Sequence, residues 1–250
     1  MQIIQTIAEL KNIRAKIKSQ VGFVPTMGNL HAGHLSLLQA ALTDNEVTFL
    51  SIFINPTQFN NEDDFHHYPK TLAKDLAQAE ALQVDYVFIP TQEEMYPDQY
   101  SYKIVETSLS HRLEGKYRPR HFEGMLTIVM KLLLLVLPQR AYFGEKDYQQ
   151  YQLICRLAQA FFLPTKIVAC QTVREPSGLA MSSRNNFLSD EQKEQAKLFP
   201  KYFHSGLPCQ QIKELLIKAG FVVDYVEEYE NRRFAAVRIG SIRLIDNIPT

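Results

Sequence analysis

The chain has 250 residues, which is enough for one large domain or two domains of ordinary size. Its 27 Lys and Arg residues balance its 27 Asp and Glu residues, which argues against nucleic acid or an anionic membrane as a partner. The three cysteines, Cys155, Cys170 and Cys209, form no CxxC pair, which predicts reduced thiols and a cytoplasmic protein. The apolar run 126–137 is too short for a membrane span, so we expect a buried helix there.

Apolar runs of strand length alternate with helical patterns over the first two thirds of the chain. The predicted strands are 21–24, 47–54, 86–89, 141–143 and 166–169, and the predicted helices are 35–42, 71–82, 122–137 and 148–161. The strands lack polar alternation, which is typical of a parallel sheet covered on both faces. This pattern predicts an α/β fold with a doubly wound parallel sheet.

The composition changes after Asn186. A capping box at Ser189–Gln192 predicts a helix to about 203, and a second helix is predicted over 210–219. Strands are predicted at 222–228, 234–239 and 242–245, with a tight turn at Gly240. We therefore expect two domains, 1–186 and a small α+β domain over 187–250.

The stretch Phe23–Leu38 joins the first predicted strand to a helix. It carries Gly28, Gly33 and two histidines, His31 and His34, at the junction. A helix N-terminus attracts phosphate, and glycines let a ligand approach the backbone closely. We expect a nucleotide site here. A metal pair is disfavoured, since no HExxH glutamate or nearby cysteine is present, and two solvated histidines are the plain alternative.

Polar side chains also follow the second predicted strand. Asn55 and Gln58 are amides, which suit an uncharged hydroxylated ligand, although Asn55 alone is typical of an Asn-Pro turn. Asp63, Asp64 and Asp75 are acidic residues near the same end of the sheet. Paired carboxylates of this kind can hold Mg²⁺, whereas a solvated acidic loop is the commoner outcome for the first two.

Two later segments carry side chains suited to phosphate. Lys146 stands at a predicted helix N-terminus, where a cation is unfavourable for the helix dipole, so we expect it to face a phosphate rather than to be a plain surface lysine. Gln150 lies one turn further along. The loop 174–186 contains three serines and two arginines, including Arg184, and is either a phosphate loop or an interdomain linker.

Seven stretches, in order along the chain, resemble the pantothenate synthetase (pantoate–β-alanine ligase) family of the HIGH-motif nucleotidyltransferase superfamily. They are PTMGNLHAGH, FINPTQF, YPKTLAKDL, RPRHFEGMLTIVMKL, FGEKDYQQ, REPSGLAMSSRN and RLIDN. The resemblance implies a Rossmann-like domain that binds ATP and pantoate over 1–186 and a lid domain over 187–250. It also implies a homodimer and Mg²⁺ with ATP as cosubstrate.

The resemblance implies a ligase that forms a C–N bond in two steps. ATP converts (R)-pantoate to pantoyl adenylate with release of pyrophosphate, and β-alanine then displaces AMP to give pantothenate. Two alternatives stay open. One is another small-carboxylate adenylating enzyme or nucleotidyl transferase of the superfamily, and the other is a nucleotide-binding module without catalysis.

Residue roles are implied where this sequence matches the family's motifs. The implied catalytic residues are His34, His31, Lys146 and Arg184. The implied ATP-binding residues are Met27, Gly28, Asn29, Leu30, His31, Ala32, Gly33, His34, Gly144, Glu145, Lys146, Asp147, Val173, Met181, Ser182, Ser183 and Arg184. The implied substrate-binding residues are Asn55, Gln58, Gln150 and His121, and Asp75 matches an acidic position near the metal and phosphates.

The chain departs from the family pattern at two places. Arg120 stands where the family usually has a glycine, and if that position needs a positive φ, Arg120 adds strain beside His121. The segment Glu227–Arg233 replaces a longer connection, which predicts a C-terminal domain trimmed at its edge.

Overall fold

The computed structural model describes residues 1–60 and 65–250, so the predicted acidic residues Asp63 and Asp64 lie outside the described residues. The chain divides into two compact units. The first contains Met1–Leu30, His34–Gly144 and Gln149–Cys170, and the second contains His31–Gly33, Glu145–Tyr148 and Gln171–Thr250.

Within the described residues, the first unit contains a six-stranded sheet in the order β1-β4-β3-β2-β5-β6, and all of its pairs are parallel. The strands are β1 Gln2–Ile4, β2 Val21–Thr26, β3 Val47–Ile52, β4 Tyr86–Phe88, β5 Arg140–Gly144 and β6 Lys166–Cys170. The predicted doubly wound parallel sheet is confirmed. The short edge strand β1 was not predicted.

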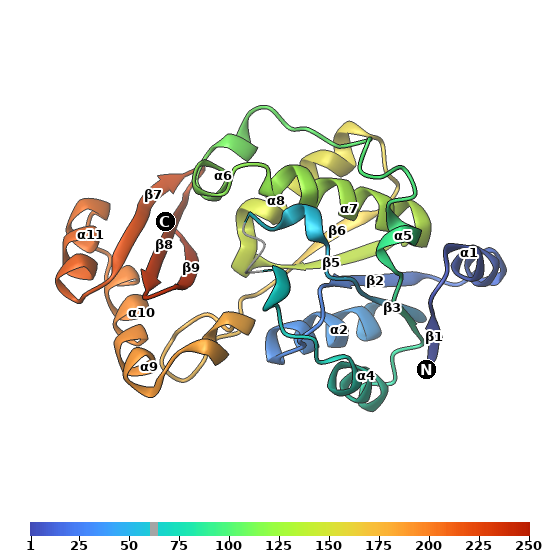
Figure 1. Cartoon of the computed structure of the whole chain (residues 1–250), viewed down its shortest axis with the longest axis horizontal. Coiled ribbons are helices and arrows are strands. Elements are labelled where there is room, and N and C mark those ends of the chain that lie inside the picture. The colour runs from blue at the N-terminus through green and yellow to red at the C-terminus, as the bar shows by residue number, and fades with distance from the viewer. Residues whose placement is uncertain (61–64) are drawn as a thin grey trace. The chain divides into compact units, whose positions relative to one another are not determined.

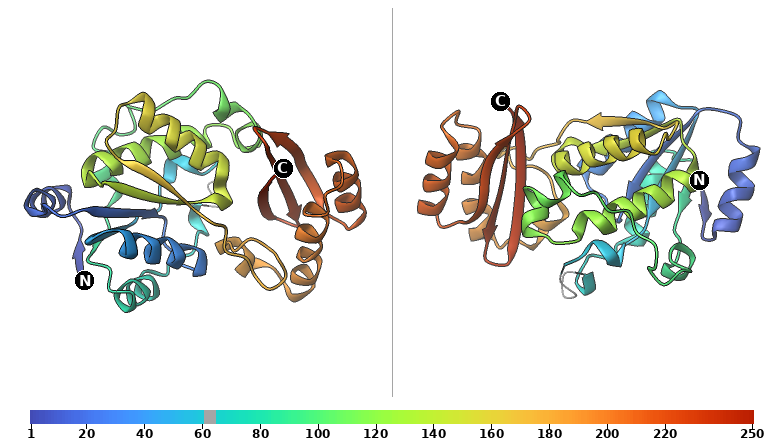
Figure 2. Two further views of the ribbon diagram at one scale, coloured as in Figure 1. Left: turned by 180° about the vertical axis from the view of Figure 1, so that it is seen from behind. Right: turned by 90° about the horizontal axis from the view of Figure 1, so that it is seen from above.

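Helices cover both faces of this sheet (Figure 1). The described α-helices of residues 1–170 are α1 Ile7–Lys16, α2 Ala32–Asp44, α4 Leu72–Ala81, α5 Gln92–Met95, α6 Glu114–Tyr117, α7 His121–Val136 and α8 Tyr148–Ala160. Figures 1 and 2 show α2 and α4 on one face and α7 and α8 on the other. Helix α1 contacts the C-terminal end of α7, where the Arg14 guanidinium donates to the carbonyls of Val136 (2.7 Å) and Leu137 (2.9 Å).

The order of the strands reverses between β2 and β5. The chain moves from β2 to β3 on one side, whereas β5 pairs with β2 on the other. Phe23 pairs with Ala141, so the last residues of the two strands, Thr26 and Gly144, stand level with each other. Ligands of doubly wound sheets bind outside the carboxyl ends of the strands at such a reversal. The sheet therefore starts two of the predicted site loops side by side.

Helix α7 packs tightly against the turn Pro56–Gln58. A Cβ at Gly124 would collide with the carbonyl of Thr57, so glycine permits this close approach. The apolar face of α7 is buried, which confirms the buried helix expected from the run 126–137. Among the helices of the described residues, none combines the length and the apolar character that crossing a membrane requires.

In the described part of the chain, the second unit has a three-stranded antiparallel sheet in the order β7-β8-β9. Its elements are α9 Asp190–Ala196, α10 Leu198–Phe203, α11 Cys209–Lys218, β7 Val222–Tyr229, β8 Arg232–Ile239 and β9 Ile242–Pro249. Its core includes Phe199, Phe203, Leu216 and Phe221. The expected capping box is present, with Ser189 and Gln192 bonded reciprocally. The expected single helix to about 203 is instead two helices.

Both hairpin turns of this sheet contain two residues. Ile239 pairs with Ile242 across Gly240, which has a φ of 56° and makes the predicted tight turn. Tyr229 pairs with Arg232, and the intervening Glu230 and Asn231 have φ values of 47° and 59°. Positive φ at both positions is the requirement of the hairpin turn whose twist matches the strands. The segment 227–233 is therefore a short hairpin connection.

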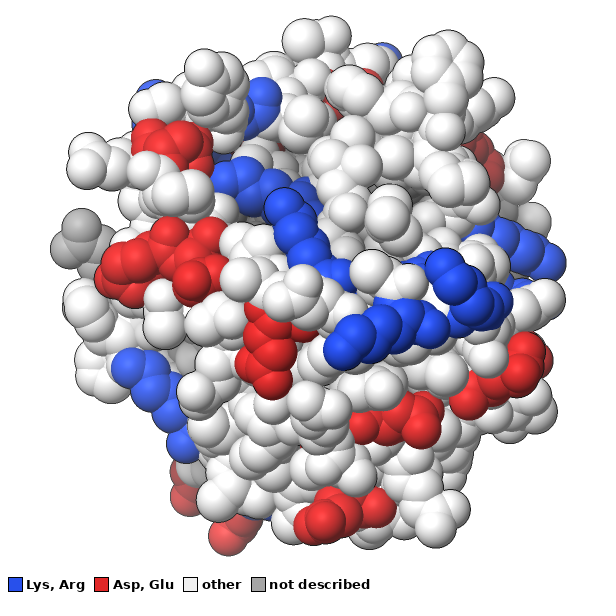
Figure 3. All heavy atoms as spheres, turned by 90° about the vertical axis from the view of Figure 1, so that its right-hand side faces the viewer, with Lys and Arg blue, Asp and Glu red and all other residues white. Residues whose placement is uncertain are grey.

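The surface carries both signs of charge. On the face drawn in Figure 3, Lys and Arg side chains lie among Asp and Glu side chains, and neither sign covers that face alone. This distribution agrees with the balanced composition.

Arg120 has a φ of 66° and a ψ of −4°, which is the left-handed region. The side chain is exposed, so its contacts offset little of the strain. Since this region costs an L-residue energy that glycine avoids, Arg120→Gly should stabilise the protein by roughly 1 kcal/mol. We expect the unfolding temperature to rise by about 2–4 °C. Arg120→Ala keeps the Cβ and is the matched control; equal shifts for both variants would show that φ is not the cause.

Candidate active site

The loop after β2 is held by a buried carboxylate from α4. Asp75 is 1% exposed, and its two oxygens accept the backbone N–H groups of Asn29 (2.9 Å) and Leu30 (2.8 Å). The Thr71 hydroxyl also donates to this carboxylate, at 3.1 and 3.2 Å. Gly28 has a φ of 80°, and a Cβ there would lie 3.0 Å from an Asp75 oxygen. Asp75 therefore fixes the shape of the predicted nucleotide loop, which sequence reasoning did not anticipate.

The two predicted histidines follow this loop. His34 lies in the first turn of α2 and is half-buried. His31 precedes the helix, and its Nδ1 accepts the N–H of Gly33 at 3.1 Å. A neutral His31 ring therefore carries its proton on Nε2.

Burial, and then the positive charge of Lys146, lower the pKa of His31 to about 4, against a smaller opposing effect of Asp147. His31 is consequently neutral at pH 7. It can offer a hydrogen bond to a phosphate but not a full charge.

The predicted amides Asn55 and Gln58 are both buried and lie close together. The Asn55 Nδ2 donates to the Gln58 Oε1 at 3.2 Å and to the Gly124 carbonyl at 3.1 Å. The Asn55 Oδ1 accepts the Tyr96 hydroxyl at 2.7 Å. Asn55 thus contacts protein groups on both sides of its amide and orients Gln58. The Gln58 Nε2 points to the sulfur of Met27, 2.7 Å away.

His121 stands directly behind Gln58. Its Nδ1 lies 2.7 Å from the Gln58 carbonyl oxygen, and its Nε2 lies 3.0 Å from the Arg118 guanidinium. Since guanidinium only donates, Nε2 accepts and Nδ1 carries the proton that it donates to Gln58. His121 is buried and supports the backbone of Gln58. It does so although the neighbouring Arg120 has a positive φ.

The two glutamines that open α8 have different surroundings. Gln149 is 2% exposed; its Oε1 accepts the Glu114 N–H at 3.0 Å, and its Nε2 donates to the carbonyls of Leu109 (2.9 Å) and Arg112 (2.8 Å). Gln150, the residue predicted to bind substrate, is half-buried. Gln149 is therefore a structural amide, and only Gln150 keeps the predicted role.

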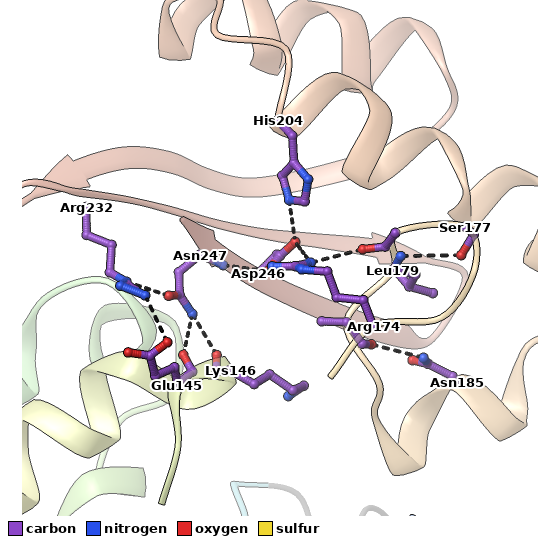
Figure 4. A network of polar contacts seen from close by, with 12 residues as sticks. Glu145, Lys146, Arg174, Ser177, Leu179, Asn185, His204, Arg232, Asp246 and Asn247 are labelled. Carbon is purple, nitrogen blue, oxygen red and sulfur yellow. Dashed lines mark hydrogen bonds and ion pairs between the residues drawn. The ribbon is translucent and has the colours of Figure 1, made fainter. Parts of the chain in front are cut away.

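The turn that follows β5 contains Lys146 and belongs to the second unit. Glu145–Asp147 form one 3₁₀ turn before α8 begins. The Lys146 Nζ lies 3.5 Å from an Asp147 oxygen, and its side chain is 20% exposed. Asn247 of β9 donates to the carbonyls of Glu145 and Lys146, as Figure 4 shows.

The predicted phosphate loop is an ordered hairpin. Arg174 pairs with Ala180 in an antiparallel bridge, and the Met181 N–H donates to the Val173 carbonyl at 3.0 Å. The Ser182 hydroxyl then accepts the Arg184 N–H at 3.3 Å and starts a 3₁₀ helix, Ser183–Phe187. These internal hydrogen bonds give the segment a hairpin shape, and its role as a phosphate loop stays a prediction.

A buried carboxylate anchors this hairpin to the C-terminal sheet. Arg174 donates to the two oxygens of Asp246 at 2.8 and 2.9 Å, and His204 lies 3.0 Å from one of them. Burial by itself raises the pKa of Asp246, but hydrogen bonds and charge from His204 and Arg174 outweigh burial and hold that pKa below its usual value.

Each unit brings together part of the predicted set. The first unit holds Met27, Gly28, Asn29, Leu30, His34, Asn55, Gln58, Asp75, His121, Gly144 and Gln150. The second unit holds His31, Ala32, Gly33, Glu145, Lys146, Asp147, Val173, Met181, Ser182, Ser183 and Arg184. Sequence reasoning missed the supporting residues Tyr96, Gln149, Arg232, Asp246 and Asn247. Only the RLIDN stretch marked the last two.

Comparisons with known proteins cover nearly the whole chain. A sequence model described as Pantoate-beta-alanine ligase matches residues 2–249. The chain is 57% identical, over 249 residues, to a pantothenate synthetase of Coxiella burnetii (strain Dugway 5J108-111), with 99% of this chain and 96% of that protein covered. It is 51% identical to a pantothenate synthetase of Legionella pneumophila (strain Philadelphia 1), with 99% of each covered.

Solved structures show the same similarity. The pantoate-beta-alanine ligase from Francisella tularensis, complexed with beta-gamma ATP and beta-alanine, has a TM-score of 0.94 and 42% identity, covering 100% of this chain and 97% of that one. The pantothenate synthetase from Thermus thermophilus has a TM-score of 0.90 and 38% identity, covering 100% of this chain and 99% of that one.

The charges around His31 predict opposite changes in its pKa for two substitutions. An NMR titration should show the His31 ring gaining its proton near pH 4, far below 6.5. Because Lys146 repels the imidazolium and Asp147 attracts it, Lys146→Met should raise this pKa and Asp147→Asn should lower it. Unfolding free energy should fall as pH drops from 6.5 to 4, since only the unfolded chain takes up the proton there. A wild-type midpoint at 6.5 or above would contradict this assignment.

Proposed function

The chain belongs to the pantoate–β-alanine ligase family, and on this premise we propose that it joins (R)-pantoate to β-alanine through a pantoyl adenylate. A pantoate carboxylate oxygen attacks the α-phosphorus of ATP, and pyrophosphate leaves. The amine of β-alanine then attacks the activated carbonyl carbon, loses a proton and forms the C–N bond as AMP leaves. The observation that carries this proposal is the similarity over the full chain, at 57% identity.

The first step must bring two anions together. We propose that His34, Lys146 and Arg184 stabilise the charge that builds up on the α-phosphate and on the departing pyrophosphate. His31 supplies a neutral N–H, because its pKa of about 4 leaves it uncharged. A well-placed donor of this kind lowers a barrier by roughly 3–4 kcal/mol. The segments with the predicted ATP residues supply the remaining contacts through backbone N–H groups and the Ser182 and Ser183 hydroxyls.

Pantoate is an uncharged diol apart from its carboxylate, and amides suit it. Gln58 and Gln150 are proposed to bind pantoate directly, and Gln58 also approaches β-alanine. Support comes from the hydrogen bonds that hold Gln58. Asn55 contacts the Gln58 side chain, and the His121 ring contacts the Gln58 backbone carbonyl. Asn55 and His121 thus act mainly through Gln58.

Mg²⁺ is proposed to enter with ATP, bound mostly by phosphate oxygens and water, as is usual for this ion. Among the described residues, no group of three or more His, Cys, Asp or Glu side chains forms a metal site. Asp75 already accepts two N–H groups and a hydroxyl. Its metal role stays a prediction, and its contacts with the loop support the separate role of shaping the ATP site.

The wider organisation is also proposed from the family. Residues 1–186 act as the Rossmann-like domain for ATP and pantoate, and residues 187–250 act as the lid that excludes water from the adenylate. A cytoplasmic homodimer is proposed. Sedimentation equilibrium measures the assembly state directly.

An omission series tests the function. ATP with pantoate should release pyrophosphate, whereas sustained AMP release should require β-alanine as well. His34→Ala should slow pyrophosphate release by roughly a hundredfold, while the exposed His111→Ala serves as the control. Turnover with a different carboxylate would favour another adenylating enzyme, and ATP binding without turnover would favour a non-catalytic module.

The neighbouring glutamines provide a matched pair. Gln150→Ala should raise the KM for pantoate by about tenfold, through loss of a hydrogen bond, with a smaller effect on the KM for ATP. Gln149→Ala should instead lower stability by roughly 1–3 kcal/mol, because it leaves buried backbone groups unpaired. Steady-state kinetics and chemical denaturation separate the two effects; equal changes in both KM values for Gln150→Ala would contradict the pantoate role.

A further inference from the structure

Asn247 of β9 binds the backbone of the turn that carries Lys146. Its Nδ2 donates to the Glu145 carbonyl at 2.9 Å and to the Lys146 carbonyl at 2.8 Å, so one amide group holds two successive peptide units. Asn247 is 4% exposed. Figure 4 shows the side chain reaching from the strand to the turn. All of these residues belong to the second unit.

The orientation of this amide is fixed by its partners. The Asn247 Oδ1 accepts the Arg232 Nε–H at 2.7 Å. A flipped amide would place its oxygen against two carbonyl oxygens and its NH₂ against a guanidinium, and neither guanidinium nor NH₂ accepts a hydrogen bond. Asn247 therefore has one arrangement that satisfies its whole environment.

Arg232 adds two contacts to the same turn. Its guanidinium carbon lies 3.8 Å from the centre of the Tyr148 ring, and its Nη2 lies 3.7 Å from a Glu145 carboxylate oxygen. Arg232 itself is 9% exposed, whereas the Glu145 side chain is 29% exposed. Asn247 and Arg232 thus hold the turn at Glu145, Lys146 and Tyr148, on both sides of the lysine.

Asp246, the residue before Asn247 in β9, is bonded to the hairpin that leads to Met181–Arg184. Asp246 binds Arg174, and Arg174 also donates to the Gly178 carbonyl at 3.0 Å, within the hairpin that leads to Met181–Arg184. Successive side chains of a strand point to opposite faces. Two adjacent residues of one strand are therefore bonded to the two segments that carry Lys146 and Arg184.

We propose that Asn247 is a positioning residue for Lys146, and that β9 sets the placement of both phosphate-binding segments of the second unit. This inference rests on the proposed function, because it assigns importance to where the Lys146 ammonium stands. Asn247 touches no reacting atom in this account. Its effect on ATP must therefore pass through Lys146, and this dependence can be measured.

The test is a double-mutant cycle between Asn247→Asp and Lys146→Ala. Asn247→Asp keeps the size of the side chain and the acceptor for Arg232, but it replaces the two donated hydrogens with an oxygen that faces two carbonyls. We expect the KM for ATP in pyrophosphate release to rise by roughly tenfold or more, with the KM for β-alanine changed less than about twofold. In the Lys146→Ala background, the same substitution should change the KM for ATP by less than about twofold.

Asp224→Asn is the matched control. Asp224 is a buried carboxylate of the same sheet that binds Arg238 (3.2 Å) and Arg243 (2.7 Å), outside the turn. This variant should lower stability without a selective rise in the KM for ATP. If Asn247→Asp does not fold, Arg232→Lys, which removes the Nε–H donated to Asn247, takes its place in the cycle.

The outcomes separate the inference from the proposed function. Unchanged ATP kinetics in Lys146→Ala would overturn the role of Lys146, and the inference would fall with it. An effect of Asn247→Asp that is equal in both backgrounds, or that matches Asp224→Asn, would overturn the positioning role alone and leave the function standing.

Discussion

The two hydrogen bonds from the Asn29 and Leu30 backbone N–H groups to the Asp75 carboxylate are the interaction on which the predicted nucleotide loop depends. Unpaired N–H groups in a buried loop are costly in free energy, so the loop that leaves β2 needs hydrogen-bond acceptors. The first N–H groups of the next helix also lack partners within the helix, so the position of its first turn depends on the loop before it. One carboxylate from α4 meets both needs. The start of α2, and with it His34, takes its place from this contact. Residues far apart in sequence thus determine the local shape that the motif alone suggested.

The same device recurs at each predicted segment. A buried polar side chain holds the backbone or side chain of a predicted segment: Asn55, three residues away, and His121 hold Gln58, Asn247 holds the Lys146 turn, and Asp246 holds Arg174. These supports are satisfied hydrogen-bond networks, which are rigid because each unpaired member would be costly. Several of the groups proposed to contact ATP and pantoate are therefore held in place by hydrogen bonds from buried neighbours.

The sequence predicted what depends on neighbours along the chain. Uninterrupted apolar runs predicted the parallel sheet, and Ser189 with Gln192 predicted a helix start, because both signals are local. The family's glycine raised the question of a positive φ at Arg120, and the φ there is 66°. The partners of Asp75, Asn55 and Asn247 were missed, since a polar residue shows its type but not which distant backbone it will meet. The helix break at Lys197 was missed, although Pro200 signals it because a proline there has no N–H to donate to the Ala196 carbonyl.

The central claim is that the carboxylate of pantoate becomes bonded to the α-phosphorus of ATP. Pantoate labelled with ¹⁸O in both carboxylate oxygens tests this directly, with the AMP product analysed by mass spectrometry after a reaction with ATP and β-alanine. A pantoyl adenylate intermediate predicts AMP that carries one ¹⁸O, because the bridging oxygen stays with phosphorus when the amine attacks the carbonyl carbon. AMP without the label, formed together with pantothenate, would contradict an adenylate intermediate.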